Sequence, residues 1–187
     1  MKTTILALIS TCSLAQLHAA TIYDESTDGP LSDVGTAPTI LGSLALGDSD
    51  IIGQVGGGIR NHFTFNVAPG QALDAITLVS GTGVNHFFGI AEGVTFPTSG
   101  LLIGGLFSGT DTDDFLDTFA DGGNLGSPTG VEGSSLDAGD YTILVNETLA
   151  GSFDFQLRLS TVEAVPEPSS TLLASLAIGL GLVRRRR

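Results

Sequence analysis

Tryptophan is absent from this chain of 187 residues, and lysine and arginine are scarce. Seven basic residues stand against 20 acidic ones, which gives a formal net charge of −13. Nucleic-acid binding depends on Lys and Arg contacts with phosphate, so this balance excludes a nucleic-acid partner. The length suits one domain with short appendages.

Cysteine occurs once, as Cys12, so residues 21–164 have no thiol and no disulfide framework. They also lack lysine, and the chain has no Gly-x-Ser-x-Gly, His-Glu-x-x-His or phosphate-binding loop. These absences predict a protein that is not an enzyme and needs no cofactor. A glycosidase using an acid pair such as Asp111 and Asp117 is the catalytic alternative, although no Trp is available for sugar stacking.

Charge is segregated along the chain. Residues 21–164 contain nineteen acids but only two basic residues, Arg60 and Arg158, so this body has a net charge of −17. Such a surface keeps a protein soluble and monomeric outside the cell. It also offers carboxylates to divalent cations, which is the second interpretation.

Residues 1–20 have the composition of a secretory signal peptide. Lys2 precedes an apolar stretch that begins Ile5-Leu6-Ala7-Leu8-Ile9, and small residues follow at Ala19 and Ala20. We expect signal peptidase to cut after Ala19 or Ala20. An N-terminal membrane anchor is the alternative, but about a dozen apolar residues fall short of the roughly 20 that span a bilayer.

The other end, residues 165–187, has three parts in a fixed order. An extended segment contains Pro166, Glu167 and Pro168, because two prolines prevent regular helix. Thr171–Val183 is almost wholly apolar, and as a helix it would cover only about 20 Å. It therefore spans a membrane marginally and only transiently. The chain ends in basic residues that resist translocation and should hold the body outside the cytoplasm: Arg184, Arg185, Arg186 and Arg187.

This order resembles the PEP-CTERM sorting signal of Gram-negative bacteria, with Pro166-Glu167-Pro168 in the position of the family's motif. The resemblance implies recognition by an exosortase, an integral-membrane enzyme similar to cysteine proteases. It further implies removal of the tail and export to the cell surface or extracellular matrix. A plain C-terminal anchor with a coincidental Pro-Glu-Pro is the alternative.

The body itself is predicted to be all-β. Its 144 residues include 24 glycines, which cluster between short runs of β-branched and aromatic residues. Alternation predicts strands at 61–67 and 153–159, and others are expected at 40–46, 51–55, 73–79, 84–91, 101–107 and 141–145. The turn Ala68-Pro69-Gly70-Gln71 predicts a hairpin. About eight short strands need two stacked sheets.

Residues 40–160 resemble a bacterial pre-peptidase C-terminal domain, a jelly-roll-like β-sandwich. The resemblance rests on Phe63-Thr64-Phe65, the following turn, Leu136–Thr142 and Phe153–Leu159. It implies an accessory extracellular module, of a kind that is often attached to secreted proteases, although none is attached in this chain. Asn61 and His62 stand where the family commonly has Asp and Tyr.

Two groups of residues are candidate metal ligands. One loop carries carboxylates that suit calcium, although without the EF-hand spacing, so a solvated loop is the alternative: Asp111, Asp113, Asp114 and Asp117. Asn-His-Phe occurs twice, at 61–63 and 85–87, and suggests paired histidines. His62 is expected to be an exposed strand residue instead, because it alternates with Phe63.

These features predict a secreted or surface-sorted structural protein with three segments, 1–20, 21–164 and 165–187. Its partners would be signal peptidase, an exosortase and, transiently, the inner membrane. A binding module for exopolysaccharide or a surface protein is the first alternative, and a hydrolase is the second.

Overall fold

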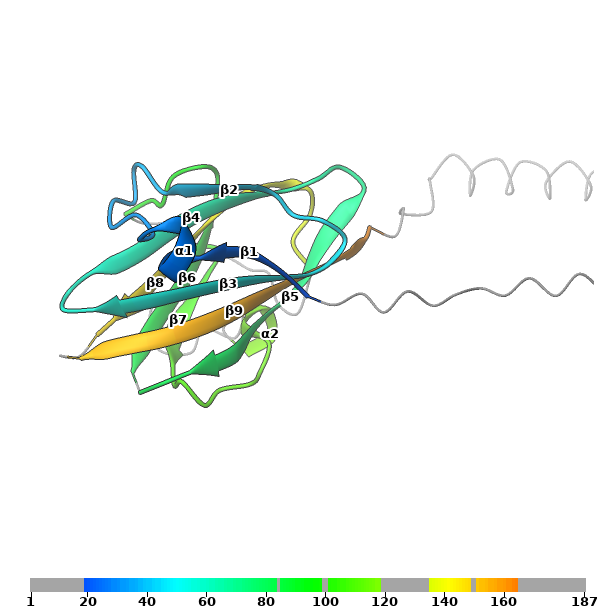
Figure 1. Cartoon of the computed structure of the whole chain (residues 1–187). Coiled ribbons are helices and arrows are strands. Elements are labelled where there is room, and N and C mark those ends of the chain that lie inside the picture. The colour runs from blue at the N-terminus through cyan, green and yellow to red at the C-terminus, as the bar shows by residue number, and fades with distance from the viewer. Residues whose placement is uncertain (1–18, 84, 99–100, 119–134, 149–150, 165–187) are drawn as a thin grey trace, which may run out of the picture.

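The body is a β-sandwich of two facing sheets (Figure 1). The computed structural model describes residues 19–83, 85–98, 101–118, 135–148 and 151–164. The four-stranded sheet has the order β1 (Ala20–Asp24), β3 (Gly47–Gly56), β9 (Ser152–Glu163), β5 (Gln71–Gly81). The five-stranded sheet has the order β2 (Thr39–Ser43), β4 (Arg60–Val67), β8 (Gly139–Glu147), β6 (His86–Glu92), β7 (Ile103–Phe107). Two one-turn helices, α1 (Glu25–Asp28) and α2 (Phe115–Thr118), lie in the connections.

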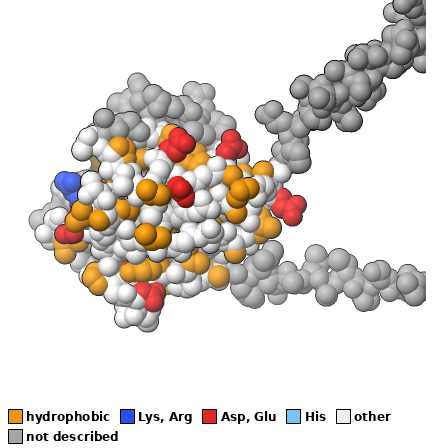
Figure 2. Space-filling model, turned by 90° about the horizontal axis from the view of Figure 1, so that it is seen from above, with side chains coloured by type: hydrophobic (Ala, Val, Ile, Leu, Met, Phe, Trp, Pro, Cys, Tyr) orange, Lys and Arg blue, Asp and Glu red, His pale blue; other side chains and the backbone are white. Residues whose placement is uncertain are grey.

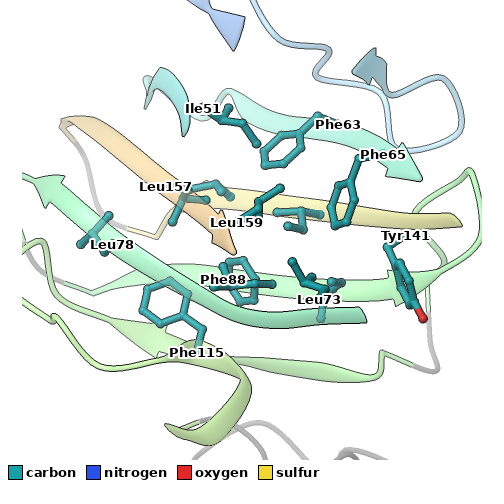
Figure 3. Packing of buried hydrophobic residues seen from close by; sticks show 14 of the residues in the cluster. Ile51, Phe63, Phe65, Leu73, Leu78, Phe88, Phe115, Tyr141, Leu157 and Leu159 are labelled. Carbon is teal, nitrogen blue, oxygen red and sulfur yellow. The ribbon is translucent and has the colours of Figure 1, made fainter. Parts of the chain in front are cut away.

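The core fills the space between the sheets (Figure 3). Alternate residues of β4 point inward, so Phe63, Phe65 and Val67 are at most 2% exposed. From the opposite sheet, β9 contributes Phe153, Phe155, Leu157 and Leu159, which are equally buried. Burial of each such side chain contributes about 1.5–3 kcal/mol, so these two strands supply much of the stabilisation.

All eight predicted strands form, but the predicted hairpin is wrong. The turn at Pro69 and Gly70 does exist, since Gln71 N donates to Ala68 O at 3.0 Å and Gly70 has φ of +84°. However, β4 and β5 belong to different sheets, so the turn crosses the sandwich instead of pairing its two strands. A ninth strand, β1, pairs in parallel with β3 and was not predicted.

Candidate functional site

The chain enters and leaves the body at the same end of the sandwich (Figure 1). At the entrance, Ala20 pairs with Ser49 of β3. At the exit, Thr161 of β9 pairs with Gly47 of the same strand. The predicted leader and the predicted sorting tail therefore attach to the body at the same end of the sandwich.

The sorting motif begins directly after the last residues of the sandwich. Glu163, at the end of β9, pairs with Gln71 of β5. Ala164 N then donates to Gly70 O at 2.9 Å. The predicted segment that follows, including Pro166, Glu167, Pro168, the apolar stretch and Arg184 to Arg187, lies outside the described residues, as does most of the leader. Within the described ranges, no helix is long and apolar enough to cross a membrane.

A cleft of about 590 Å³ lies along β3 and β9 and is bordered by α1, with a lining that is mainly apolar and carries a few polar side chains. Its lining includes the amides of Gln54 and Gln156, which donate and accept hydrogen bonds, and the carboxylate of Asp154, which accepts them, beside Ile52 and Ile59. Gln54 Nε2 donates to Asp154 Oδ1, and Gln156 Nε2 donates to Asp50 Oδ2 at 2.9 Å. These bonds tie the amides of the cleft in place across β3 and β9.

One wall of this cleft is held by Glu25 in α1. Its Oε1 accepts from Leu31 N at 2.6 Å and from Asn61 Nδ2 at 3.1 Å. Its Oε2 accepts from Gln54 N. A single carboxylate therefore fastens α1 to β3 and β4. Sequence inspection did not select Glu25, because its partners lie up to 36 residues away.

A second groove, of about 450 Å³, lies beside edge strand β2. It is more apolar, with Pro38, Ile40 and Val94 in its lining together with Asn66. Ile40 is 80% exposed. Acidic side chains are spread over the face in Figure 2 and do not gather at one point.

Two of the four predicted calcium ligands, Asp111 and Asp114, accept hydrogen bonds from the backbone in the structure. Asp114 Oδ1 accepts from Ile76 N at 2.9 Å and from Leu116 N at 3.0 Å, which fastens the loop to β5 and α2. Burial raises the pKa of the Asp114 carboxyl. Asp111 Oδ2 accepts from Ser108 N at 2.7 Å, while Asp113 and Asp117 are exposed. Among the described residues, no three His, Cys, Asp or Glu side chains are placed to hold a metal ion.

Calcium binding by this loop stays a prediction with a direct measurement. A ligand that binds only the folded body stabilises it, by about 2.7 kcal/mol at a hundred times its dissociation constant. If Asp111, Asp113, Asp114 and Asp117 move together around calcium, the melting temperature in millimolar calcium will exceed that in chelator. D113N/D117N should abolish the difference. Equal melting temperatures would identify the loop as solvated charge.

His62 is buried, with 4% of its surface exposed, so the prediction of an exposed residue is wrong. Two loops cover this outer face of the five-stranded sheet. His62 N donates to Ser32 O at 2.7 Å, and the ring packs edge-on against Phe96 with centroids 5.5 Å apart. Phe96 N donates to Gly35 O at 2.8 Å, so the loops also hold each other. The buried Nδ1 atom of His62 has no hydrogen-bond partner among the described residues.

Burial lowers the pKa of His62, with a further lowering from nearby Arg60 that the Ser32 backbone and Asp33 oppose. Between the folded pKa and about 6.5, the unfolded chain therefore binds more protons than the folded one. Stability should fall as the pH drops through this window, by up to about 1.4 kcal/mol per pH unit. Denaturant unfolding at several pH values should show this slope in the parent and not in H62Q. Equal slopes in the two proteins would contradict the prediction.

His86 does not pair with His62 as a second ligand. It is 1% exposed, stacks on Phe153 with ring centroids 3.6 Å apart, and Nε2 lies 2.8 Å from Thr82 O. Its Nδ1 is 3.0 Å from Glu147 Oε2, a close polar contact that lacks the alignment of a hydrogen bond. His86 therefore connects the core residue Phe153 to the loop that contains Thr82, at the end of the sandwich opposite the exit.

Comparison with protein families assigns the end of the chain, since residues 164–187 match the PEP-CTERM protein-sorting motif. The chain carries a PEP-CTERM sorting motif. This motif marks an exported protein that an exosortase processes at the membrane. The match includes Pro166, Glu167, Pro168 and the terminal arginines, as the sequence predicts.

Solved structures resemble the body of this PEP-CTERM protein. One is the pre-peptidase C-terminal domain of a Bacillus anthracis collagenase, with 18% identity, a TM-score of 0.39, and coverage of 65% of this chain and 93% of that one. Another is PliG of Aeromonas hydrophila, a periplasmic inhibitor of g-type lysozyme, with 15% identity, a TM-score of 0.36, and coverage of 66% and 98%. No curated protein matches the chain.

Proposed function

We propose that the acidic sandwich is a non-enzymatic structural cargo of the exosortase route, delivered to the cell surface or extracellular matrix. The observation that carries this proposal is the direct joining of a sorting motif to a body with a charge of −17. Like charges on neighbouring copies repel, which keeps an exported protein dispersed until it is retained in a hydrated matrix.

Fractionation combined with intact mass tests this proposal. In an exosortase-positive host, the body should appear in the surface or matrix fraction with a mass that lacks both the leader and the tail. That mass also identifies the bonds cut and any group attached. A body that keeps the mass of the apolar segment and stays in the inner membrane would contradict the proposal.

The polar side chains of the cleft along β3 and β9 support a second candidate, a binding module for exopolysaccharide. Amide and carboxylate side chains such as Gln54, Gln156 and Asp154 suit the hydroxyl groups of a sugar, since they donate and accept hydrogen bonds. This candidate predicts retention of the processed protein by purified exopolysaccharide. Q54A/Q156A should weaken retention, whereas N66A, an amide truncation in the groove beside β2, should not. If the parent, Q54A/Q156A and N66A are retained equally, the cleft is not the binding site for the polysaccharide.

A further inference from the structure

The last residues of β9 are held differently from the rest of that strand. Up to Thr161, β9 lies between two partners, since Gly47 of β3 and Leu73 of β5 both pair with Thr161. Beyond Thr161, the pairing with β3 ends and only β5 continues, as far as Glu163. The final segment, Val162–Ala164, is therefore bound on one side only.

Burial changes at the same residue. Thr161 is 3% exposed, and its Oγ1 lies within hydrogen-bond distance of the carbonyl oxygens of Ala45 and Gly47. Val162 is 40% exposed, and Glu163 is exposed as well. Strand ends with few buried contacts open at a small fraction of the global unfolding free energy. Opening from the exit should therefore proceed to Thr161 and stop there.

The intact pairing leaves the sorting motif very little reach. Ala164 N is bonded to Gly70 O, and only Val165 separates Ala164 from Pro166. Two residues extend at most about 7 Å, which is less than the diameter of a single helix at the rim of a membrane enzyme. Opening Val162–Ala164 lengthens the tether, counted from Thr161, to about 17 Å.

We propose that Val162–Ala164 is a releasable spacer. It pairs with β5 in the folded body and separates from β5 so that Pro166-Glu167-Pro168 can reach the exosortase. The proposal rests on exosortase processing of the tail. It makes Gln71 of β5 and Gly70 of the preceding turn positioning residues for that reaction, because they hold the spacer against β5 until the motif is delivered. The buried Thr161 fixes how far the motif can travel from the body.

A disulfide that locks the spacer to β5 tests the proposal. Gln71 and Glu163 are direct antiparallel partners, and the bond from Ala164 N to Gly70 O makes them a non-hydrogen-bonded pair, in which the Cβ atoms come close. Cys12 is the single native cysteine, so C12S leaves no competing thiol. Oxidised C12S/Q71C/E163C should accumulate untrimmed in an exosortase-positive host. Dithiothreitol added to spheroplasts should restore trimming.

The matched control places the same cross-link at the other end of β9. Gln54 and Asp154 also form a non-hydrogen-bonded pair, because Gly57 N donates to Gly151 O, and these two residues lie three positions from Gln54 and Asp154 towards the same end of the strand pair. Oxidised C12S/Q54C/D154C should be trimmed as fast as C12S. An eight-residue Gly-Ser insertion after Ala164 should rescue the locked variant, since it replaces the lost reach.

The outcomes separate this proposal from the processing route itself. Failure of C12S to be trimmed would reject exosortase processing of this chain. If C12S is trimmed and the locked Q71C/E163C variant is trimmed at the same rate, the releasable spacer is wrong. If the insertion fails to rescue the locked variant, reach is not the property that the lock removes, and the proposal is equally overturned.

Discussion

Replacement of Pro166, Glu167 and Pro168 by alanine is expected to leave an uncut precursor in the inner membrane. Each proline disfavours helix by about 3 kcal/mol, so the sequence predicts an extended segment in the parent, whereas alanine would allow a predicted helix over Thr171–Val183 to extend towards the body. The variant also loses the residues in the position of the family's motif. Pulse-chase labelling with membrane fractionation should show full insertion and no trimmed product.

The basic end of the tail provides a matched comparison with a different defect. Replacing Arg184 to Arg187 with glutamine removes the positive charge that resists translocation, so the tail should slip across the membrane. This variant should be lost from the membrane stage, whereas the alanine variant accumulates there. If the alanine variant is trimmed and exported like its parent, Thr171–Val183 acts only as an anchor.

The alternation of apolar and polar residues predicts a strand correctly wherever one face of that strand packs against the core. Phe63 and Phe65, or Phe153 and Phe155, recur with period two, and the structure buries all four. The outer face is harder to predict, because loops distant in sequence can cover it. His62 alternates as an exposed residue would, yet Ser32 and Phe96 belong to segments that fold over it.

The hairpin error has a related cause. A turn rich in proline and glycine indicates only that the chain reverses direction. The same Pro69-Gly70 geometry can join two strands of one sheet or two strands of opposite sheets. Which of these occurs depends on the partner that each strand finds. β5 pairs with β9, whose sequence begins 71 residues after β5 ends, so no local pattern contains this information.

The partners of polar side chains in the body are also distant in sequence, so the sequence does not predict them. Asp50 is 4% exposed and accepts two hydrogen bonds from Arg158, at 2.8 and 2.9 Å, across 108 residues of sequence. This bond to Asp50 raises the pKa of the Arg158 guanidinium. Composition identifies Arg158 as one of two basic residues in the body, but not its partner. Likewise, the spacing of Asp111 and Asp114 cannot distinguish a cation ligand from an acceptor for backbone N–H groups.

The two neighbouring phenylalanines of β6 offer the sharpest test of the sandwich. Phe88 is 0% exposed and contacts Phe115 of α2 with ring centroids 4.9 Å apart (Figure 3). Phe87 is adjacent in the same strand, faces the other side of the sheet and is partly exposed. The two residues share their chemistry, their strand and their neighbourhood, and differ in the face that they occupy.

Truncation of Phe88 should therefore cost far more stability than truncation of Phe87. F88A removes a ring from between the sheets and leaves a cavity, which costs about 3–5 kcal/mol. F87A gives up most of the transfer free energy of a partly buried side chain but leaves no cavity between the sheets, which costs about 1–2 kcal/mol. For a body of this size, the melting temperatures should differ by about 10 °C, measurable by circular dichroism at a β-sheet wavelength. Equal losses would mean that β6 does not present Phe88 to a core between two sheets, because only burial on one face distinguishes the two rings.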